Sequence, residues 1–117
     1  MDLEFQVNGK IARPVAEVFD AVYNPKKLSG YFTTGVEPGR LIVLGWEAAE
    51  GGYETEVRME FEALEGDATL VRISESGWKE TPAGLKSSYG NCMGWTQMLC
   101  CLKVYLEQGV NLRAFFF

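Results

Sequence analysis

Residues 53–63 restrict the fold more than any other part of the sequence. Their side chains alternate without a break, so that one face carries Tyr53, Thr55, Val57, Met59, Phe61 and Ala63, and the other carries Glu54, Glu56, Arg58, Glu60 and Glu62. Because neighbouring side chains of a strand point to opposite faces, the pattern predicts a strand of an antiparallel sheet, buried on one face and wet on the other. We interpret the glutamate row as a solvated face; an acidic docking surface is the alternative.

Three other segments are predicted to be strands of the same sheet. Residues 3–11 alternate except for a slip near Asn8-Gly9, and residues 40–46 form an apolar run that suits a well-covered strand. A turn at Gly66-Asp67 leads into residues 69–76, whose inner face carries Val71, Ile73 and Glu75. Residues 35–39 are rich in glycine and proline and are predicted to form a loop.

Two helices are predicted. The first opens at Arg13-Pro14, because proline is tolerated at the first helical position, and Asn24-Pro25 ends it. Residues 26–30 are predicted to form one further short turn. Thr81 suits the cap and Pro82 the first turn of the second helix, which would be about 43 Å long over residues 82–110. The apolar residues of the first helix recur at helical spacing: Val15, Val18, Phe19 and Val22.

The long helix has apolar residues on two sides. The stripe predicted to face the sheet consists of Leu85, Tyr89, Cys92, Thr96, Leu99, Leu106 and Val110. Behind it lie Met93, Met98, Cys101, Val104 and Tyr105. A helix that is apolar on both sides usually has cover on both sides. Gly90 and Gly94 lower its helix propensity, which predicts either a close backbone approach or a bend at these positions.

The composition indicates one globular domain over residues 1–117, with 47% hydrophobic and 23% charged residues. Eleven basic side chains against sixteen acidic ones give a net charge of −5, which argues against broad binding to nucleic acid or anionic membrane. No apolar run approaches the roughly 18 residues of a membrane span. The sequence has no histidine, so catalysis and metal binding that require an imidazole are excluded.

The three cysteines indicate a reducing compartment. On one helix Cys92 and Cys100 would lie about 12 Å apart, too far for a disulfide or a shared metal, and the adjacent Cys100 and Cys101 point in different directions. Nothing typical of a secretory signal precedes them. We interpret all three as packing residues and expect a cytoplasmic protein.

Glu75 is the candidate for carboxylate chemistry, because strand alternation places it on the inner face. Burial disfavours the charged form of a carboxylate, which is one way in which a fold creates a general base. The favoured alternative is that Glu75 pairs with a cation or a backbone amide and organises the rim of a pocket. We therefore assign no catalytic residue beyond this candidate, and expect neither a metal nor an organic cofactor.

Four stretches of the sequence resemble one known family over nearly the whole chain. They are IARPVAEVFDAVYNPKKLSGYFTT, YETEVRMEFEAL, LVRISESGWKE and GLKSSYGNCMGWTQMLCCLKVYLEQGVNLR, which begin at Ile11, Tyr53, Leu70 and Gly84. The most specific segments are residues 74–78 and the pair Gly94-Trp95. The sequence resembles the C-terminal domain of activators of the heat-shock protein 90 ATPase, a family of the START-like SRPBCC superfamily.

The resemblance implies an α+β helix-grip fold, in which an antiparallel sheet wraps around a long C-terminal helix and leaves a cavity. Members usually have two more strands before the one near Arg40, so we expect a sheet shortened by about two strands after Thr34. Aromatic residues of such a cavity suit an apolar ligand that is held by burial of surface; those of this sequence are Tyr31, Phe32, Trp46, Tyr53, Trp78, Tyr89 and Trp95. The predicted pocket residues are Tyr53, Val57, Met59, Phe61, Ile73, Glu75, Trp78, Tyr89, Trp95, Thr96 and Leu99.

Three functions are compatible with these observations. The favoured one is non-catalytic binding of a small hydrophobic ligand, unless the aromatic residues simply fill the core. A co-chaperone-like interaction with heat-shock protein 90 is the first alternative, and a cyclase- or hydrolase-like enzyme that uses Glu75 is the second. The shortened sheet and the apolar back of the long helix predict a homodimer. The alternative to the dimer is a complete monomer whose full chain has further residues after Thr34.

Overall fold

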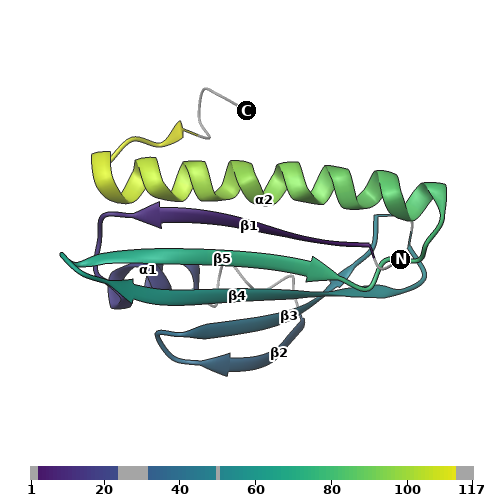
Figure 1. Ribbon diagram of the computed structural model, residues 1–117, viewed down its shortest axis with the longest axis horizontal. Helices are drawn as coiled ribbons and strands as arrows, with labels where there is room; N and C mark the ends of the chain where they lie inside the picture. Colours follow the sequence, from purple (N-terminus) through teal and green to yellow (C-terminus); the bar gives the residue numbers. More distant parts are fainter. Residues whose placement is uncertain (1–2, 24–31, 50, 113–117) are drawn as a thin grey trace.

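The computed structural model describes residues 3–23, 32–49 and 51–112, which form one antiparallel sheet and two helices (Figure 1). The strands lie in the order β1-β5-β4-β3-β2. The α+β class, with an antiparallel sheet and a long helix, is confirmed. In chain order the elements are β1 (Glu4–Ile11), α1 (Val15–Val22), β2 (Phe32–Glu37), β3 (Leu41–Glu47), β4 (Glu54–Leu64), β5 (Ala68–Ser76) and α2 (Pro82–Gln108).

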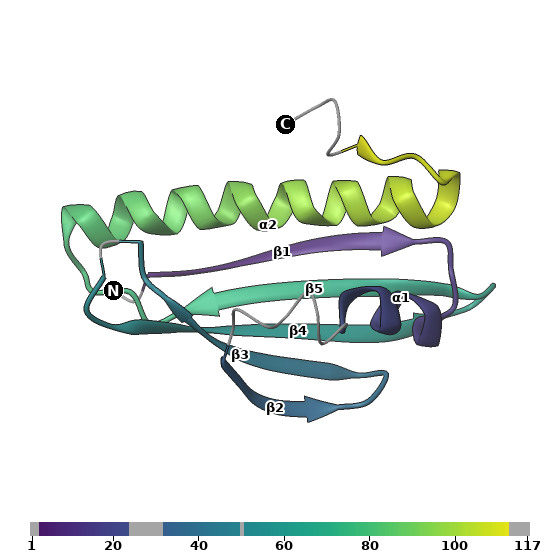
Figure 2. The ribbon, with the colours of Figure 1, turned by 180° about the vertical axis from the view of Figure 1, so that it is seen from behind.

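Both helices pack against the sheet. The long helix α2 follows β1 from end to end, and α1 lies against β4 and β5, on the side that faces the viewer in Figure 2. With 27 residues α2 is about 40 Å long, close to the 43 Å of the longest dimension of the molecule. The core between these elements contains Ile11, Val18, Phe19, Val22, Ile42, Leu44, Val57, Met59, Phe61, Val71, Ile73 and Leu99.

The predicted alternation is confirmed from Thr55 to Phe61 in β4 and from Val71 to Glu75 in β5, whereas Ala63, assigned to the buried face, is exposed. Four residues of β4 are buried and the charged residues between them are exposed, so the glutamate row lies on the outer face of the sheet. In β5 the inner face carries Val71, Ile73 and Glu75. Gly66 and Asp67 make the turn between the two strands with φ values of 77° and 55°, the left-handed region that glycine adopts without strain.

The segment predicted to be a loop at residues 35–39 is largely a strand. β2 pairs with β3 from Phe32 to Glu37, with a register shift between Thr33 and Gly35. Only Pro38, Gly39 and Arg40 form the turn, where Gly39 has a φ of 74°. Gly35 resembles a loop residue in the sequence but accommodates an irregularity inside the strand. The described sheet therefore has five strands, not the four that the sequence indicates. The predicted turn at residues 26–30 lies outside the described residues.

The predicted slip at Asn8-Gly9 in β1 is also wrong. The register between β1 and β5 is continuous, and the inward and outward positions alternate through Gly9. A Cβ atom on Gly9 would lie 3.6–3.8 Å from the side chain of Leu99. The glycine therefore interrupts the hydrophobic pattern without interrupting the strand, because Leu99 of α2 covers the place where a side chain would be.

The predicted beginning of α2 is confirmed. Thr81 is the N-cap and accepts a hydrogen bond from the backbone N–H of Gly84 at 3.0 Å, and Pro82 is the first helical residue. A Cβ atom on Gly84 would lie 2.0 Å from the carbonyl oxygen of Lys79, so this position requires glycine. The helix ends before Gly109, whose φ of 71° is typical of a C-terminal cap.

The predicted phase of α2 is wrong over much of its length. Leu85, Tyr89, Thr96 and Val110 are exposed, and 67% of the surface of Tyr89 is accessible. Leu99 is buried at 6%, as predicted, and Leu106 packs against the core. The side of α2 expected to be its back is partly the groove side. Of those residues, Met98, Cys101 and Tyr105 line the groove described below, Val104 is half-buried and Met93 is exposed.

A polar cluster fastens the C-terminal end of α2 to the connection between β1 and α1. The carboxylate of Glu107 accepts hydrogen bonds from the backbone N–H of Ala12 at 2.8 Å and from Lys103 Nζ at 2.6 Å. Lys103 Nζ also donates to the carbonyl oxygen of Lys10 at 2.7 Å. Arg13 Nε donates to the carbonyl oxygen of Leu106 at 2.9 Å, which satisfies one of the free carbonyls at the helix end.

Candidate functional site

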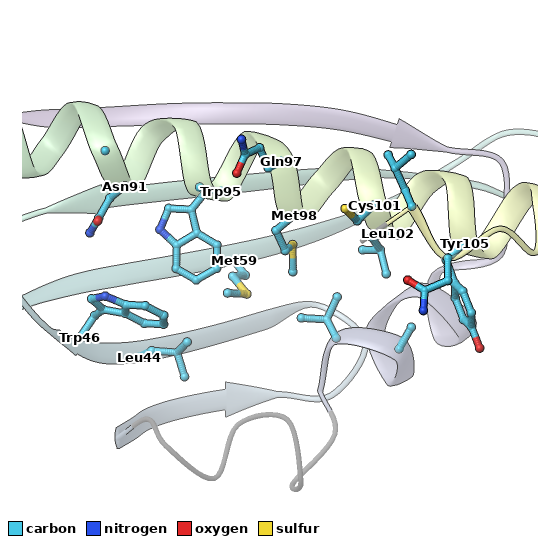
Figure 3. Close-up of a pocket in the computed structure, with 16 residues that line it drawn as sticks. Leu44, Trp46, Met59, Asn91, Trp95, Gln97, Met98, Cys101, Leu102 and Tyr105 are labelled. Atoms are coloured by element: carbon cyan, nitrogen blue, oxygen red, sulfur yellow. The ribbon is translucent and has the colours of Figure 1, made fainter. Parts of the chain in front are cut away.

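A groove of about 880 Å³ lies between α2 and the sheet, with α1 at one end (Figure 3). None of its lining residues is charged, and most are apolar. Such a size and lining are typical of small-molecule sites. The lining residues are Ala21 and Val22 of α1, Leu44, Trp46 and Met59 of the sheet, Gly90, Asn91, Gly94, Trp95, Gln97, Met98, Cys101, Leu102 and Tyr105 of α2, and Asn111 and Leu112 beyond it.

Two tryptophans form the aromatic wall of the groove. Trp46 on β3 and Trp95 on α2 meet edge to face, with their ring centroids 5.1 Å apart. In Figure 3 the Trp95 ring lies beside Met59 and the Trp46 ring beside Leu44. The indole N–H of Trp95 is bonded on its other side to a buried carboxylate, so this ring is held at both ends. A wall fixed in this way presents apolar surface with little conformational freedom to lose on binding.

That carboxylate belongs to Glu75, which is 1% exposed. It accepts hydrogen bonds from Thr55 Oγ1 at 2.5 Å, from Trp95 Nε1 at 2.8 Å and from Asn91 Nδ2 at 3.0 and 3.2 Å. The inward position predicted from strand parity is confirmed. The predicted partner, a cation or a backbone amide, is not what the structure shows, since these three donors are uncharged side chains from β4 and α2. We call Glu75, Thr55, Asn91 and Trp95 the Glu75 network.

Gly90 and Gly94 lie on the side of α2 that lines the groove. A Cβ atom at either position would meet no atom within 4 Å, so no backbone approaches there. Figure 1 shows α2 running on without a break at this level. Neither of the two expected reasons for these glycines is found. Their effect is to leave open space beside Trp95.

Nine of the eleven predicted pocket residues fall into three groups in the structure. Met59 and Trp95 line the groove, and Glu75 lies behind Trp95. Tyr53 and Trp78 lie near the connection between β5 and α2, where the Tyr53 hydroxyl accepts a hydrogen bond from the Lys79 N–H and Trp78 stacks on Phe5. The remaining inward residues belong to the core and not to the groove wall: Val57, Phe61, Ile73 and Leu99.

Two predicted pocket residues are misplaced. Tyr89 and Thr96 are exposed and do not line the groove. They were assigned by helical spacing to a stripe with Leu85 and Cys92. In the first half of α2, Asn91 instead points inward and donates hydrogen bonds to Glu75. Larger apolar residues such as Leu85 and Tyr89 are exposed.

Sequence reasoning missed Leu44, Asn91 and Met98 as groove residues. Leu44 could have been found, because it alternates with Ile42 in the apolar run of β3, and both are fully buried. Met98 was placed on the back of the helix. Asn91 carries no hydrophobic signal, and its role depends on the distance to Glu75, which no sequence pattern gives.

Neither a metal nor a membrane is indicated by the part of the chain that the structure describes. Within it no group of three or more Cys, Asp and Glu side chains is placed to hold a metal ion. None of its helices is both long and apolar enough to cross a membrane.

The sequence model for the family described as activator of Hsp90 ATPase homolog 1-like protein matches residues 30–107. The chain belongs to this family. No curated protein matches the sequence of this activator-homolog domain.

Solved structures confirm the helix-grip fold of the activator-homolog domain. A protein from Staphylococcus saprophyticus is 25% identical over 93% of this chain and 95% of its own, with a TM-score of 0.72. The Aha1 dimer from Colwellia psychrerythraea is 19% identical over 92% and 98% of the two chains, with a TM-score of 0.71. An Hsp90 activator from Plasmodium falciparum is 15% identical over 89% and 96%, with a TM-score of 0.69.

Proposed function

We propose that this activator-homolog domain binds a small apolar molecule, without catalysing a reaction, in the groove between α2 and the sheet. The observation that carries the proposal is an uncharged groove of about 880 Å³ that two fixed tryptophans border. Burial of apolar surface, at about 25 cal/mol per Å², supplies the affinity. The Glu75 network supports one wall and supplies the polar end.

Gly94 of α2 allows a test that leaves the core untouched. Gly94→Leu places a large side chain into the open space of the groove, and leucine is also a better helix former than glycine. We expect this variant to fold at least as stably as the native chain and to lose most of its affinity for apolar ligands. Binding is measured by the change in fluorescence of Trp46 and Trp95 on titration with 1-decanol.

The matched control is Thr96→Leu, two residues along the same helix. Thr96 is exposed and lies outside the groove, so the variant adds a comparable side chain without filling the site. Unchanged binding in Thr96→Leu with lost binding in Gly94→Leu supports the groove. Unchanged binding in Gly94→Leu contradicts it.

A co-chaperone-like interaction is the second candidate, and one observation favours it. Leu85, Tyr89 and Met93 recur every four residues along the outer side of α2 and are 39%, 67% and 61% exposed. Large apolar side chains gathered on one exposed face are typical of protein interaction sites. The Plasmodium falciparum neighbour is an Hsp90 activator. A co-chaperone binds purified heat-shock protein 90 and changes its ATPase rate, and Tyr89→Ser should weaken both effects. If no binding is measured, this candidate fails.

An enzymatic role for Glu75 has less support. The carboxylate is buried, is not part of the groove surface and already accepts hydrogen bonds from three side chains. A molecule in the groove would meet Asn91 and Trp95 first. We also propose a reducing, cytoplasmic location, with which the three free cysteines agree.

A further inference from the structure

The orientation of the Asn91 amide is fixed by its surroundings. Asn91 Nδ2 lies 3.0 and 3.2 Å from the two carboxylate oxygens of Glu75. A carboxylate oxygen accepts hydrogen bonds, and in the asparagine amide the nitrogen is the donor. The amide must therefore turn its NH₂ group toward Glu75 and its oxygen Oδ1 away from it.

Two other side chains of the Glu75 network also point toward the carboxylate. Trp95 Nε1 donates to Glu75 at 2.8 Å, and the Thr55 hydroxyl lies 2.5 Å from the same carboxylate. Asn91 and Trp95 line the groove, whereas Glu75 does not. Within the Asn91 amide, the atom left for a ligand at this end of the groove is thus the oxygen, with a buried carboxylate directly behind the nitrogen. Figure 3 shows Asn91 at the end of the groove, beyond Trp95.

We infer that the ligand is an apolar molecule whose polar end is a hydrogen-bond donor, such as an alcohol or an amine, and that Asn91 Oδ1 accepts this bond. The inference rests on the proposed function and names its ligand class. Glu75 is a positioning residue in it, because it acts through the orientation of Asn91. An anionic end is disfavoured at this place, since Glu75 lies behind the amide and no lining residue is basic.

The experiment compares two isomers that differ in one property. 1-Decanol and 1-methoxynonane have the same atoms and nearly the same shape, but only the alcohol donates a hydrogen bond. We expect the native chain to bind 1-decanol about three- to tenfold more tightly, as one additional hydrogen bond provides. Affinities are measured by isothermal titration, with tryptophan fluorescence as a second readout.

Variants locate the preference. Asn91→Leu should abolish it by weakening the binding of the alcohol while leaving that of the ether unchanged. Gln97→Leu removes another amide from the groove lining and should retain the preference. Glu75→Gln should reduce the ratio of the affinities for 1-decanol and 1-methoxynonane. A glutamine side chain both donates and accepts hydrogen bonds, so it no longer fixes the orientation of the Asn91 amide. Thermal unfolding shows whether each variant is folded. If Glu75 has only a structural role, Glu75→Gln lowers the stability without changing the ratio of the two affinities.

The outcomes separate the two proposals. If neither isomer binds the native chain, the proposed function fails and the inference fails with it. If both bind equally, or if Asn91→Leu keeps the preference, the inference is overturned while the groove remains a binding site. Loss of the preference in Asn91→Leu, together with its retention in Gln97→Leu, supports the inference.

Discussion

Glu75 is the residue on which most polar contacts near the groove converge. Its replacement by leucine removes the carboxylate and leaves the donors of Asn91 and Trp95 without their acceptor, whereas the Thr55 hydroxyl keeps the carbonyl oxygen of Trp46. Because a buried group without a partner costs about 1–3 kcal/mol, we expect Glu75→Leu to lower the free energy of unfolding by about 2–4 kcal/mol. Chemical denaturation measures the change. Glu75→Gln retains an accepting oxygen and should lose clearly less; equal losses would contradict the role of the network.

Leu99 joins α2 to the sheet at the point where β1 has no side chain. It is buried and lies against Gly9. Leu99→Ala should lower the free energy of unfolding by about 2–5 kcal/mol, as buried leucines do. Gly9→Ala should be neutral or slightly stabilising, because its Cβ would make ordinary contacts with Leu99. A large loss in Gly9→Ala, measured by denaturant titration, would show that the two side chains are packed more tightly than the distances indicate.

For single residues, the alternation of a strand predicts which face a side chain occupies. It does not predict which residues from other elements that side chain contacts. The two-residue period of β5 places Glu75 inside, and the structure confirms it. The partners of Glu75 come from β4 and α2, 16 to 20 residues away in the chain. A pattern within one element cannot pair such residues, so Asn91 was missed, and Trp95 was assigned to the pocket by its helical position and its aromatic ring, not by its contact with Glu75.

The helix α2 contains three glycines whose replacement should have opposite effects. Alanine stabilises a helix by up to about 1 kcal/mol relative to glycine, and the open space at Gly90 and Gly94 allows this gain. At Gly84 the added Cβ would lie 2.0 Å from the carbonyl oxygen of Lys79, so the capped first turn must move. We expect Gly90→Ala and Gly94→Ala to raise the melting temperature and Gly84→Ala to lower it. The same sign at all three positions would contradict the geometry.

The phase of α2 could not be predicted from its hydrophobic spacing for a physical reason. In its first half the inner side carries Ser87, Ser88 and Asn91, while Leu85 and Tyr89 face solvent. At Asn91 the usual rule that apolar residues face the sheet does not hold, because Asn91 donates to the buried carboxylate of Glu75. β2 was missed because glycine occurs both in loops and at irregularities inside strands, and the sequence does not show which of the two contains Gly35.

The stability of the whole molecule depends on the contacts between the C-terminal end of α2 and the connection that follows β1. The pKa of Glu107 is lowered, chiefly by the hydrogen bond from Lys103 and then by the backbone N–H of Ala12. A carboxyl with a lowered pKa in the folded state contributes stability above its ordinary pKa of 4.5 and loses it as the pH falls through the lower folded value. We expect Glu107→Gln to be less stable than the native chain at pH 7 and the difference to shrink below pH 4.5. Denaturant titrations at several pH values measure it, and a difference independent of pH would contradict the argument.

The last prediction concerns assembly. β2 is the edge of the described sheet on the side away from β1, and an uncovered edge strand is a template for pairing with another chain. The other reason to expect a homodimer is weaker than the sequence indicated, because Met98 and Cys101 face the groove and do not form an open back of α2. We therefore place the contact between two copies at β2.

Gly35→Lys tests this contact. A Cβ at Gly35 makes only ordinary contacts with Val43, and lysine on an edge strand disfavours pairing. The variant should shift the mass measured by light scattering from twice 13.1 kDa toward 13.1 kDa. Ser74→Lys adds the same charge to β5, which is paired on both sides, and should leave the dimer intact. A native chain that scatters as a monomer at high concentration contradicts the dimer. A dimer that survives Gly35→Lys moves the interface to the outer side of α2, where Leu85, Tyr89 and Met93 are exposed.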